Sequence, residues 1–390
     1  MKTPLTHDVL VALRAAMAIG QPGPLGQFED QRLLPHRLFQ SVDVAGLTGL
    51  ELLLTSNWQY SSQSVTMGTR SESKAEHTGG NMSTRLFICI GLVLAGLLVA
   101  PTQAAAQLDD TTSFLAHVSN QYRVIPNVTY HVASNHENKL DLYLPNNADG
   151  MTPVLMYIHG GGWVGGTKES NVLRVLPYLE RGWAVVNVEY RLGSVARAPA
   201  AVEDCLCALR WVIANAEEYN LDTSRIVTTG NSAGGHLALT TAMIPASAGL
   251  DRECPGPEDL RVAAVINWYG ITDVGDLLDG TNTRNYAVEW MGSLENRLAI
   301  ARRVSPMTHV RSGLPPILSI HGDADPTVPY QQAVMLHKKL ADVGVPNRLH
   351  TVPGGRHGRF TREQTMAVFT TIQEFLEEHG LAKGARKSQD

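Results

Sequence analysis

Short apolar runs alternate with helical stretches along most of the second half of the chain, and this alternation limits the possible folds most strongly. The apolar runs cover about 153–159, 183–189, 225–229, 263–269, 316–321 and 347–353, and helical sequence covers 169–181, 200–219, 233–244, 330–343 and 362–379. Near-continuous apolar strands are typical of a parallel sheet that is buried on both faces. The alternation therefore predicts an α/β fold with a doubly wound, mostly parallel sheet.

Two further segments complete this expectation. Residues 124–132 and 139–144, with the polar residues 135–138 between them, predict a β-hairpin at the antiparallel N-terminal edge of the sheet. Residues 270–311 contain three short helical stretches, at 273–280, 286–291 and 295–303, and predict a small lid insertion. Loops that follow parallel strands meet at the carboxyl edge of the sheet, so we expect the functional residues there.

Ser232 lies in the pattern Gly-Asn-Ser-Ala-Gly at 230–234, directly between an apolar run and an Ala- and Leu-rich helical stretch. Small residues two positions on either side allow a sharp backbone turn that exposes the hydroxyl. The positive end of the following helix then faces the reaction centre. The context predicts a nucleophilic serine; an ordinary glycine-rich turn is the alternative.

A second glycine-rich segment, at 160–162, follows the apolar run 153–158 and precedes Trp163. A hydrolytic serine needs N–H donors aimed at the developing oxyanion, and removing one such donor costs about 3 kcal/mol of barrier. We expect Gly161 and Gly162 to supply two of these donors and Ala233 to supply the third. A phosphate-binding loop is the alternative, but its Gly-Lys-Ser/Thr ending is missing here.

Asp325 and His357 are the expected partners of the serine. Asp325 follows the apolar run 316–321 and precedes a proline, and Asp323 is the alternative acid in the same loop. His357 lies in a glycine-rich turn after the last apolar run, where a general base would be mobile enough to act. Four other histidines, His236, His337, His350 and His379, are expected to be structural or solvated.

The chain order serine, aspartate, histidine is the order found in α/β-hydrolases. Further blocks occur in the same order: Glu-Tyr-Arg-Leu at 189–192, Pro-Ala-Ala at 199–201, Asp204, and Arg-Trp-Val at 210–212. Residues 124–380 thus resemble the α/β-hydrolase superfamily and, within it, esterases of the hormone-sensitive-lipase and feruloyl-esterase-like (BD-FAE-like) groups. Asn231, where the lipase-like group often has an acid, and Arg359 depart from the family pattern. We expect Asp204 and Arg191 to brace the fold.

The resemblance and the residues together predict a serine hydrolase that cleaves carboxylic esters through an acyl-enzyme. The short segment before the glycine loop leaves little room for a cap, which favours short acyl groups or acetyl and feruloyl esters linked to carbohydrate. Trp163 either lines the substrate pocket or packs in the core. Alternatives are an arylformamidase-type amide hydrolase, a prolyl-oligopeptidase-type peptidase, for whose extra domain the chain has no room, and a non-catalytic hydrolase-like binding protein.

Residues 82–106 have the three parts of a secretory signal: Arg85, an uncharged run of apolar residues, and an Ala-rich cleavage site ending at Ala106. We expect residues 1–81 to be a non-native or disordered extension, residues 82–106 to be a signal peptide, and residues 107–390 to be the catalytic domain. The protein would then be exported, either to the periplasm or outside the cell, with no stable membrane span. An uncleaved signal anchor that tethers it to the membrane is the alternative.

Composition excludes several other functions. The net charge of −5 and the lack of basic clusters with interleaved aromatic residues argue against nucleic-acid binding. The sequence has neither His-Glu-x-x-His nor paired Cys-x-x-Cys, so we expect no metal and no cofactor. Cys205 and Cys207 point to different faces of one helix, and either could pair with Cys254. Oligomeric state is left open.

Overall fold

The structure is a computed structural model, and it describes residues 120–382 except 147, 149 and 294. The expected N-terminal extension, signal peptide and cleavage site lie outside the described residues. Among the helices that are described, none is both long enough and apolar enough to span a lipid bilayer.

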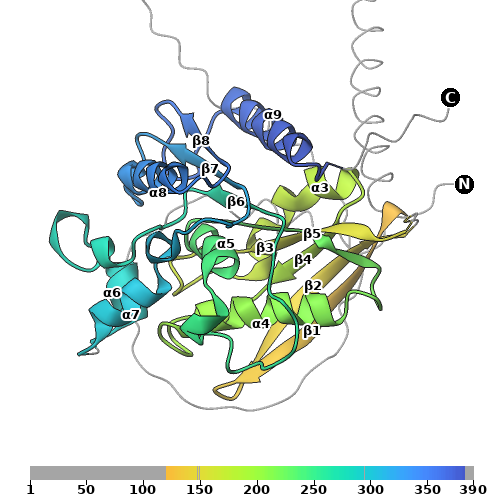
Figure 1. The fold of residues 1–390 in the computed structure, drawn as a ribbon, viewed down its shortest axis with the longest axis horizontal. Coiled ribbons are helices and arrows are strands. Elements are labelled where there is room, and N and C mark those ends of the chain that lie inside the picture. Colours follow the sequence, from red (N-terminus) through yellow and green to blue (C-terminus); the bar gives the residue numbers. More distant parts are fainter. Residues whose placement is uncertain (1–119, 147, 149, 294, 383–390) are drawn as a thin grey trace, which may run out of the picture. The chain divides into compact units, whose positions relative to one another are not determined.

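Eight strands form one sheet in the order β1-β2-β4-β3-β5-β6-β7-β8 (Figure 1). The pairs β1–β2 and β2–β4 are antiparallel, and the pairs from β4 through β3 to β8 are parallel. The predicted mostly parallel sheet with an antiparallel N-terminal edge is therefore confirmed. The strands are β1 (Tyr122–Ala133), β2 (His136–Pro145), β3 (Thr152–Ile158), β4 (Ala184–Val188), β5 (Leu221–Asn231), β6 (Ala264–Trp268), β7 (Ile317–Gly322) and β8 (Asn347–Val352).

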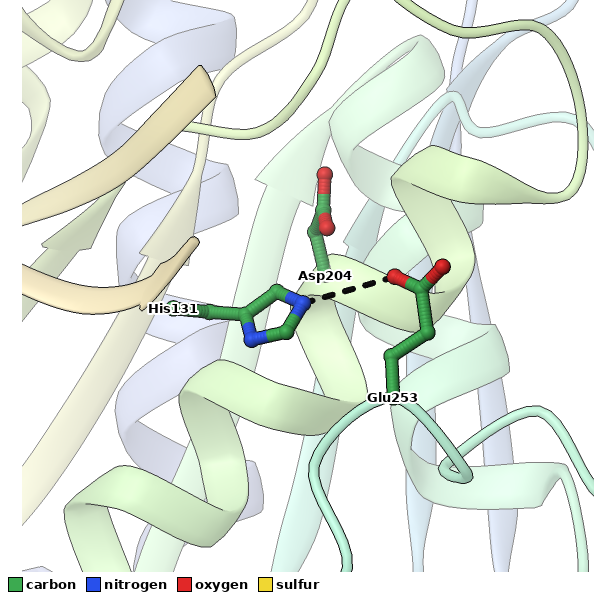
Figure 2. A group of neighbouring side chains, drawn as sticks. All are labelled: His131, Asp204 and Glu253. Atoms are coloured by element: carbon green, nitrogen blue, oxygen red, sulfur yellow. Dashed lines mark hydrogen bonds and ion pairs between the residues drawn. The ribbon is translucent and has the colours of Figure 1, made fainter. Parts of the chain in front are cut away.

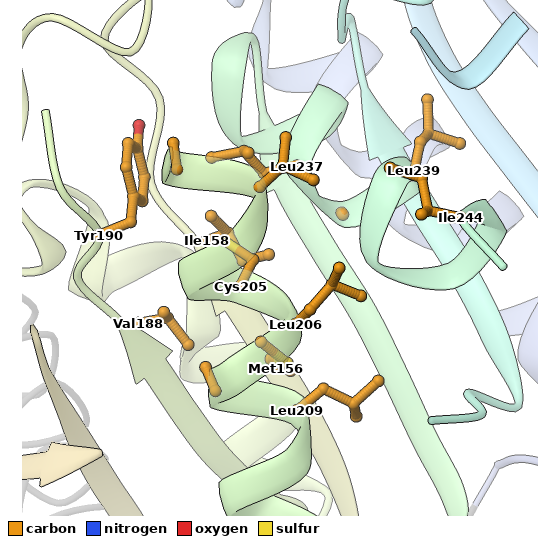
Figure 3. Close-up of a cluster of buried hydrophobic side chains, with 14 of the residues drawn as sticks. Met156, Ile158, Val188, Tyr190, Cys205, Leu206, Leu209, Leu237, Leu239 and Ile244 are labelled. Atoms are coloured by element: carbon orange, nitrogen blue, oxygen red, sulfur yellow. The ribbon is translucent and has the colours of Figure 1, made fainter. Parts of the chain in front are cut away.

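Side-chain alternation along the strands builds two cores, one on each face of the sheet. In β3, Met156 and Ile158 belong to one core, whereas Leu155 and Tyr157 belong to the other. Helices α4 (Ala200–Ala214) and α5 (Ala233–Met243) supply residues to the first core (Figure 3). Helix α8 (Tyr330–Asp342) also contributes to this core. Helices α3 (Leu176–Glu180) and α9 (Arg362–Glu378) cover the other face. Because both faces are covered, the central strands are buried and mostly apolar, and polar residues such as Thr228 and Asn267 within them are buried as well.

The hairpin and one predicted helix differ in detail from expectation. The turn between β1 and β2 consists of Ser134 and Asn135 alone, both with positive φ, so the strands continue through residues that we expected to be loop. The stretch 169–181 is not one helix. It forms the 3₁₀ segment η1 (Lys168–Val175), which is interrupted at Asn171 with φ −134°, and then the short helix α3.

The predicted lid region contains short helices, as expected. It is built from η3 (Gly275–Leu277), η4 (Gly280–Asn282), α6 (Asn285–Met291), α7 (Arg297–Val304) and η5 (Pro306–His309), and it lies between β6 and β7 in the chain. Another 3₁₀ turn, η2 (Ala246–Ala248), follows α5.

A disulfide resolves the cysteine question that the sequence left open. Cys207 of α4 bonds to Cys254, and Cys205 is a buried free thiol. The bond fixes α4 to the long connection between α5 and β6.

Candidate active site

The serine turn joins β5 to α5 and has a backbone conformation that is rare for a residue with a side chain. Ser232 has φ 56° and ψ −120°, so the chain reverses sharply at this residue. A Cβ atom at Gly230 would lie 2.4 Å from the carbonyl oxygens of Gly234 and Ile158, and one at Gly234 would lie 2.1 Å from that of Ile158. The flanking glycines are therefore required by close backbone contacts, as the sequence pattern predicted.

His357 contacts this serine from the turn between β8 and α9. Its Nε2 lies 3.0 Å from Ser232 Oγ, and its side chain is 22% exposed, so both solvent and substrate can reach it. The bond joins residues 125 positions apart in the sequence.

Asp325 lies on the other side of the same imidazole. Its Oδ2 is 2.7 Å from His357 Nδ1, and its Oδ1 accepts the backbone N–H groups of Thr327 and Val328. Burial alone would raise the pKa of Asp325, but hydrogen bonds from His321 and His357 and the backbone N–H of Thr327 hold this pKa well below its usual range. Asp325 is therefore an anion, and the N–H of His357 at Nδ1 donates to it.

Asp323, the alternative acid, has a different role. Its Oδ1 accepts the backbone N–H of Gly354, and the residue is exposed. It fixes the start of the histidine turn and does not contact His357 in any hydrogen bond of the described residues.

The expected oxyanion donors lie in two loops beside the serine. Gly161 and Gly162 have φ 122° and 62°, and the carbonyl oxygen of Gly161 accepts from the N–H groups of Val164 and Gly165. Among the hydrogen bonds of the described part of the chain, the N–H groups of Gly161, Gly162 and Ala233 donate to no protein atom. They are free to donate to a substrate oxygen.

Trp163 packs in the core, the second of its two expected alternatives, so its assignment to the substrate pocket is corrected. Its side chain is fully buried, its ring stacks on Trp290 of α6 with centroids 4.2 Å apart, and its Nε1–H donates to His236. The left-handed φ of 62° at Trp163 turns the side chain into the core instead of toward the substrate. Tyr286 of α6 packs closely against the glycine loop: a Cβ atom added to Gly162 would lie 2.8 Å from the Cβ of Tyr286.

His236 is structural, as expected. It is fully buried one turn into α5, accepts from Trp163 at Nδ1, and donates from Nε2 to the carbonyl of Val304. Burial lowers its pKa to about 4, so it is neutral. His337 contacts Asn347 and His350 contacts Thr371, both away from Ser232, and His379 ends α9.

Two residues beside the triad were not found from the sequence. His321, at the end of β7, has its Nε2 3.3 Å from Asp325 Oδ2. Tyr269, just after β6, packs edge-on against the ring of His357 with centroids 4.7 Å apart. Both residues lie at strand ends next to the loops that carry the triad. In the sequence, only this position could have indicated that they lie near the site.

His131, Asp204 and Glu253 form a cluster in which ligand atoms lie within 4.8 Å of one another (Figure 2). The carboxylate oxygens of this cluster already form ion pairs with Arg191. The Arg191 guanidinium lies 2.8 Å from Asp204 and 2.7 Å from Glu253. A buried cation in this position disfavours a metal ion, and the cluster instead ties β1, α4 and the loop before β6 together. Asp204 and Arg191 brace the fold, as predicted.

A cleft of about 310 Å³ lies on the side of the sheet covered by α3 and α9, and no triad residue lines it. Its lining includes Asn231 and Gly358, the sequence neighbours of Ser232 and His357, and five aromatic residues: Tyr157, Tyr178, Trp268, Phe360 and Phe369. A larger cavity of about 540 Å³ is lined by residues before β6 and β7, and no triad residue lines it.

A serine in a strained turn between a strand and a helix, a histidine–aspartate pair and a glycine loop, all on a mostly parallel sheet, are features of serine hydrolases with the α/β-hydrolase fold. The BD-FAE family model matches residues 140–340. The chain belongs to this family.

Comparison with curated proteins and solved structures supports the same class. The chain is 36% identical to the probable carboxylic ester hydrolase LipM of Mycobacterium tuberculosis over 50% of this chain and 47% of LipM, so it spans about half the length of that relative. It is 28% identical to an ethyl acetate hydrolase of Pseudomonas putida over 74% of this chain and 93% of that protein. Thermogutta terrifontis esterase 2 phosphorylated by paraoxon has a TM-score of 0.56 and 28% identity, and the match covers 68% of this chain and 96% of that one.

Proposed function

We propose that the protein hydrolyses carboxylic esters through an acyl-enzyme, with Ser232 as nucleophile, His357 as general base and Asp325 as the orienting acid. One observation carries this proposal: an unbroken chain of hydrogen bonds runs from Ser232 Oγ through both nitrogens of His357 to a buried carboxylate. An ionised Asp325 keeps the proton of His357 on Nδ1, which leaves Nε2 free to accept the serine proton.

The reaction then follows in two halves. Ser232 attacks the ester carbonyl as His357 takes its proton, and the N–H groups of Gly161, Gly162 and Ala233 bind the oxyanion. His357 returns the proton to the leaving alcohol, and an acyl-serine remains. Water activated by the same histidine releases the acid and restores the serine.

Short acyl groups fit the surroundings of the triad best. Helix α6 is fixed to the acid loop, because Arg284 Nε and Tyr286 OH both donate to the carbonyl of Thr327, at 2.8 and 3.3 Å. This contact limits the space between the glycine loop and Asp325. The similarity to an ethyl acetate hydrolase supports a small ester as substrate.

A substrate panel tests the proposal. We expect kcat/KM on p-nitrophenyl esters to be highest for acetate to butyrate and to fall steadily beyond these chain lengths, because the contact between α6 and the acid loop limits the space beside the triad. Acetylated xylan and methyl ferulate test the carbohydrate-linked option. A maximum above ten acyl carbons would contradict the short-chain proposal.

The same panel separates the alternatives. Turnover of formylkynurenine faster than that of every ester would favour the arylformamidase. A folded protein that turns over no substrate in the panel would favour the hydrolase-like binding protein.

We also propose that the protein is exported. The signal-like segment 82–106 motivates this, and the Cys207–Cys254 disulfide supports it, because disulfides persist mainly in oxidising compartments. N-terminal sequencing of the protein from fractionated cells is expected to begin near residue 107, in a fraction outside the cytoplasm. An N-terminus ahead of Met82 in the cytoplasmic fraction would overturn the proposal.

A further inference from the structure

Asp325 contacts two histidines, and the mechanism above uses one of them. Its Oδ2 lies 2.7 Å from His357 Nδ1 and 3.3 Å from His321 Nε2. The side chains of Asp325 and His321 are both fully buried, so no water competes for this oxygen. The other oxygen, Oδ1, is bound to the N–H groups of Thr327 and Val328.

One ring nitrogen of His321 has acceptors beside it, and the other has no hydrogen-bond partner. Its Nε2 lies 3.1 Å from the carbonyl oxygen of Val328 as well as near Asp325, and two acceptors require that Nε2 carries a hydrogen. Its Nδ1 is buried with no hydrogen-bond partner. A ring with its hydrogen on Nε2 satisfies both observations, and this donor faces the acid loop.

The surroundings hold this ring in place. His321 is the next-to-last residue of β7, between strands β6 and β8, and the ring of Tyr330 packs edge-on against it with centroids 5.7 Å apart. A residue that only filled this space would be apolar, since a buried nitrogen without a partner is unfavourable. The donor at Nε2 is therefore the property that distinguishes histidine here.

We propose that His321 is a positioning residue for the proposed triad: it holds the carboxylate of Asp325 so that Oδ2 faces His357 Nδ1. The inference rests on the proposed ester hydrolysis. His321 does not contact Ser232 or a substrate and transfers no proton; it acts through Asp325. Without its donor, Oδ2 would be bound by His357 alone, and the carboxylate could rotate about its two backbone contacts.

Replacement of His321 by Leu and by Gln separates positioning from packing. We expect His321→Leu to lower kcat by roughly 10- to 100-fold with little change in KM, the loss expected for one hydrogen bond to a charged group. The amide nitrogen of Gln is the same number of bonds from Cβ as Nε2, so His321→Gln should recover most of that loss. In a proton NMR spectrum, the low-field resonance of His357 Nδ1–H should shift in the Leu variant and return toward its wild-type position in the Gln variant.

His337→Leu is the matched control. His337 is also buried, also has one nitrogen without a partner, and contacts Asn347 instead of the triad. The His337→Leu variant should lose stability as His321→Leu does, but it should keep the wild-type kcat and the wild-type position of the NMR resonance.

The outcomes separate this inference from the function on which it depends. A folded His321→Leu variant with wild-type kcat and an unshifted resonance, in a protein whose turnover requires Ser232, would overturn the positioning role and leave the esterase intact. Equal kcat losses in the Leu and Gln variants would also overturn it, because the donor would then not matter. Turnover that persists in Ser232→Ala would overturn the proposed function itself.

Discussion

Asp323 and Asp325 lie two residues apart in one loop, yet their surroundings give them different chemistry. The side chain of Asp325 is fully buried and receives hydrogen bonds at both oxygens, whereas Asp323 is exposed and accepts the N–H of Gly354. A carboxylate must be ionised and fixed to orient a histidine, and Asp325 meets both conditions.

Replacement of each acid by its amide tests this assignment. We expect Asp325→Asn to lower kcat by roughly 1,000- to 10,000-fold, because an amide at this position favours the wrong tautomer of His357. Asp323→Asn is the matched control: its side-chain oxygen can still accept from Gly354, so kcat should stay close to that of the wild type. Steady-state kinetics on a short p-nitrophenyl ester measure both. The opposite result would make Asp323 the orienting acid.

At the scale of elements, the N-terminus of α9 closes the histidine turn. Thr361 Oγ1 accepts the N–H of Gln364, Gln364 Oε1 accepts the N–H of Thr361, and Gln364 Nε2 donates to the carbonyl of Pro353. One glutamine therefore joins both ends of the turn that carries His357.

Gln364→Ala is expected to cost about 1 kcal/mol of stability, the usual value of a helix cap, and also to lower kcat. The kinetic effect is expected because the bond to Pro353 is lost with the cap. Thr370→Ala is the control, since its hydroxyl bonds only to the carbonyl of Met366 on an exposed part of the same helix. Urea unfolding and kcat are measured for both. A change in stability with an unchanged kcat would show that the cap does not order the histidine turn.

The disulfide is a second feature at this scale. Cys207 and Cys254 are separated by 47 residues, and a crosslink over this length reduces the entropy of the unfolded chain. The disulfide fixes the connection before β6 to α4, next to Glu253, which pairs with Arg191.

We expect Cys254→Ser to lower the free energy of unfolding by about 4 kcal/mol, the value for a loop of this length. Cys205→Ala keeps the crosslink and serves as control. A reducing agent should lower the unfolding midpoint of Cys205→Ala and leave that of Cys254→Ser unchanged. Equal sensitivity of the two variants to reduction would mean that Cys254 is not crosslinked.

At the scale of the whole molecule, stability should fall in mild acid because the core holds a neutral histidine. The pKa of His236 is lowered to about 4 by burial, whereas histidine in an unfolded chain titrates near about 6.5. Between these values the unfolded state binds more protons, so stability is fully present above about pH 6.5 and is lost as the pH falls toward about 4. The difference is worth about 3 kcal/mol at 1.36 kcal/mol per pH unit.

Denaturant unfolding between pH 7.5 and 4.5 measures this loss. The free energy of unfolding should depend less steeply on pH in His236→Gln than in the wild type. The slopes should differ by at most the contribution of one bound proton. An unchanged slope in His236→Gln would contradict the proposed neutral, buried state.

Much of the fold could be predicted because its signals are local. Strands such as β3 are continuous apolar runs, the turn at Ser232 is marked by its glycines, and the order of serine, aspartate and histidine implies their loops. The structure brings Ser232, His357 and Asp325 together, as the sequence suggested.

The remaining features depend on contacts between distant segments. The burial of Trp163 follows from its left-handed φ and its stacking on Trp290 of the lid, and neither has a local signal. The contact of His321 with Asp325 depends on how the loop folds back over the end of β7. Cys254 pairs with Cys207 instead of Cys205 because of the way α4 is rotated against the sheet.

Covalent labelling with a fluorophosphonate, read by mass spectrometry of the whole protein and of its peptides, tests the central claim most directly. If the hydrogen-bonded chain through His357 activates Ser232 as we propose, one adduct per chain is expected, on the peptide that contains Ser232, together with loss of esterase activity. Ser232→Ala should melt as the wild type does and take up no label. A folded wild-type protein that stays unlabelled, or that carries its adduct on another residue, would contradict the account.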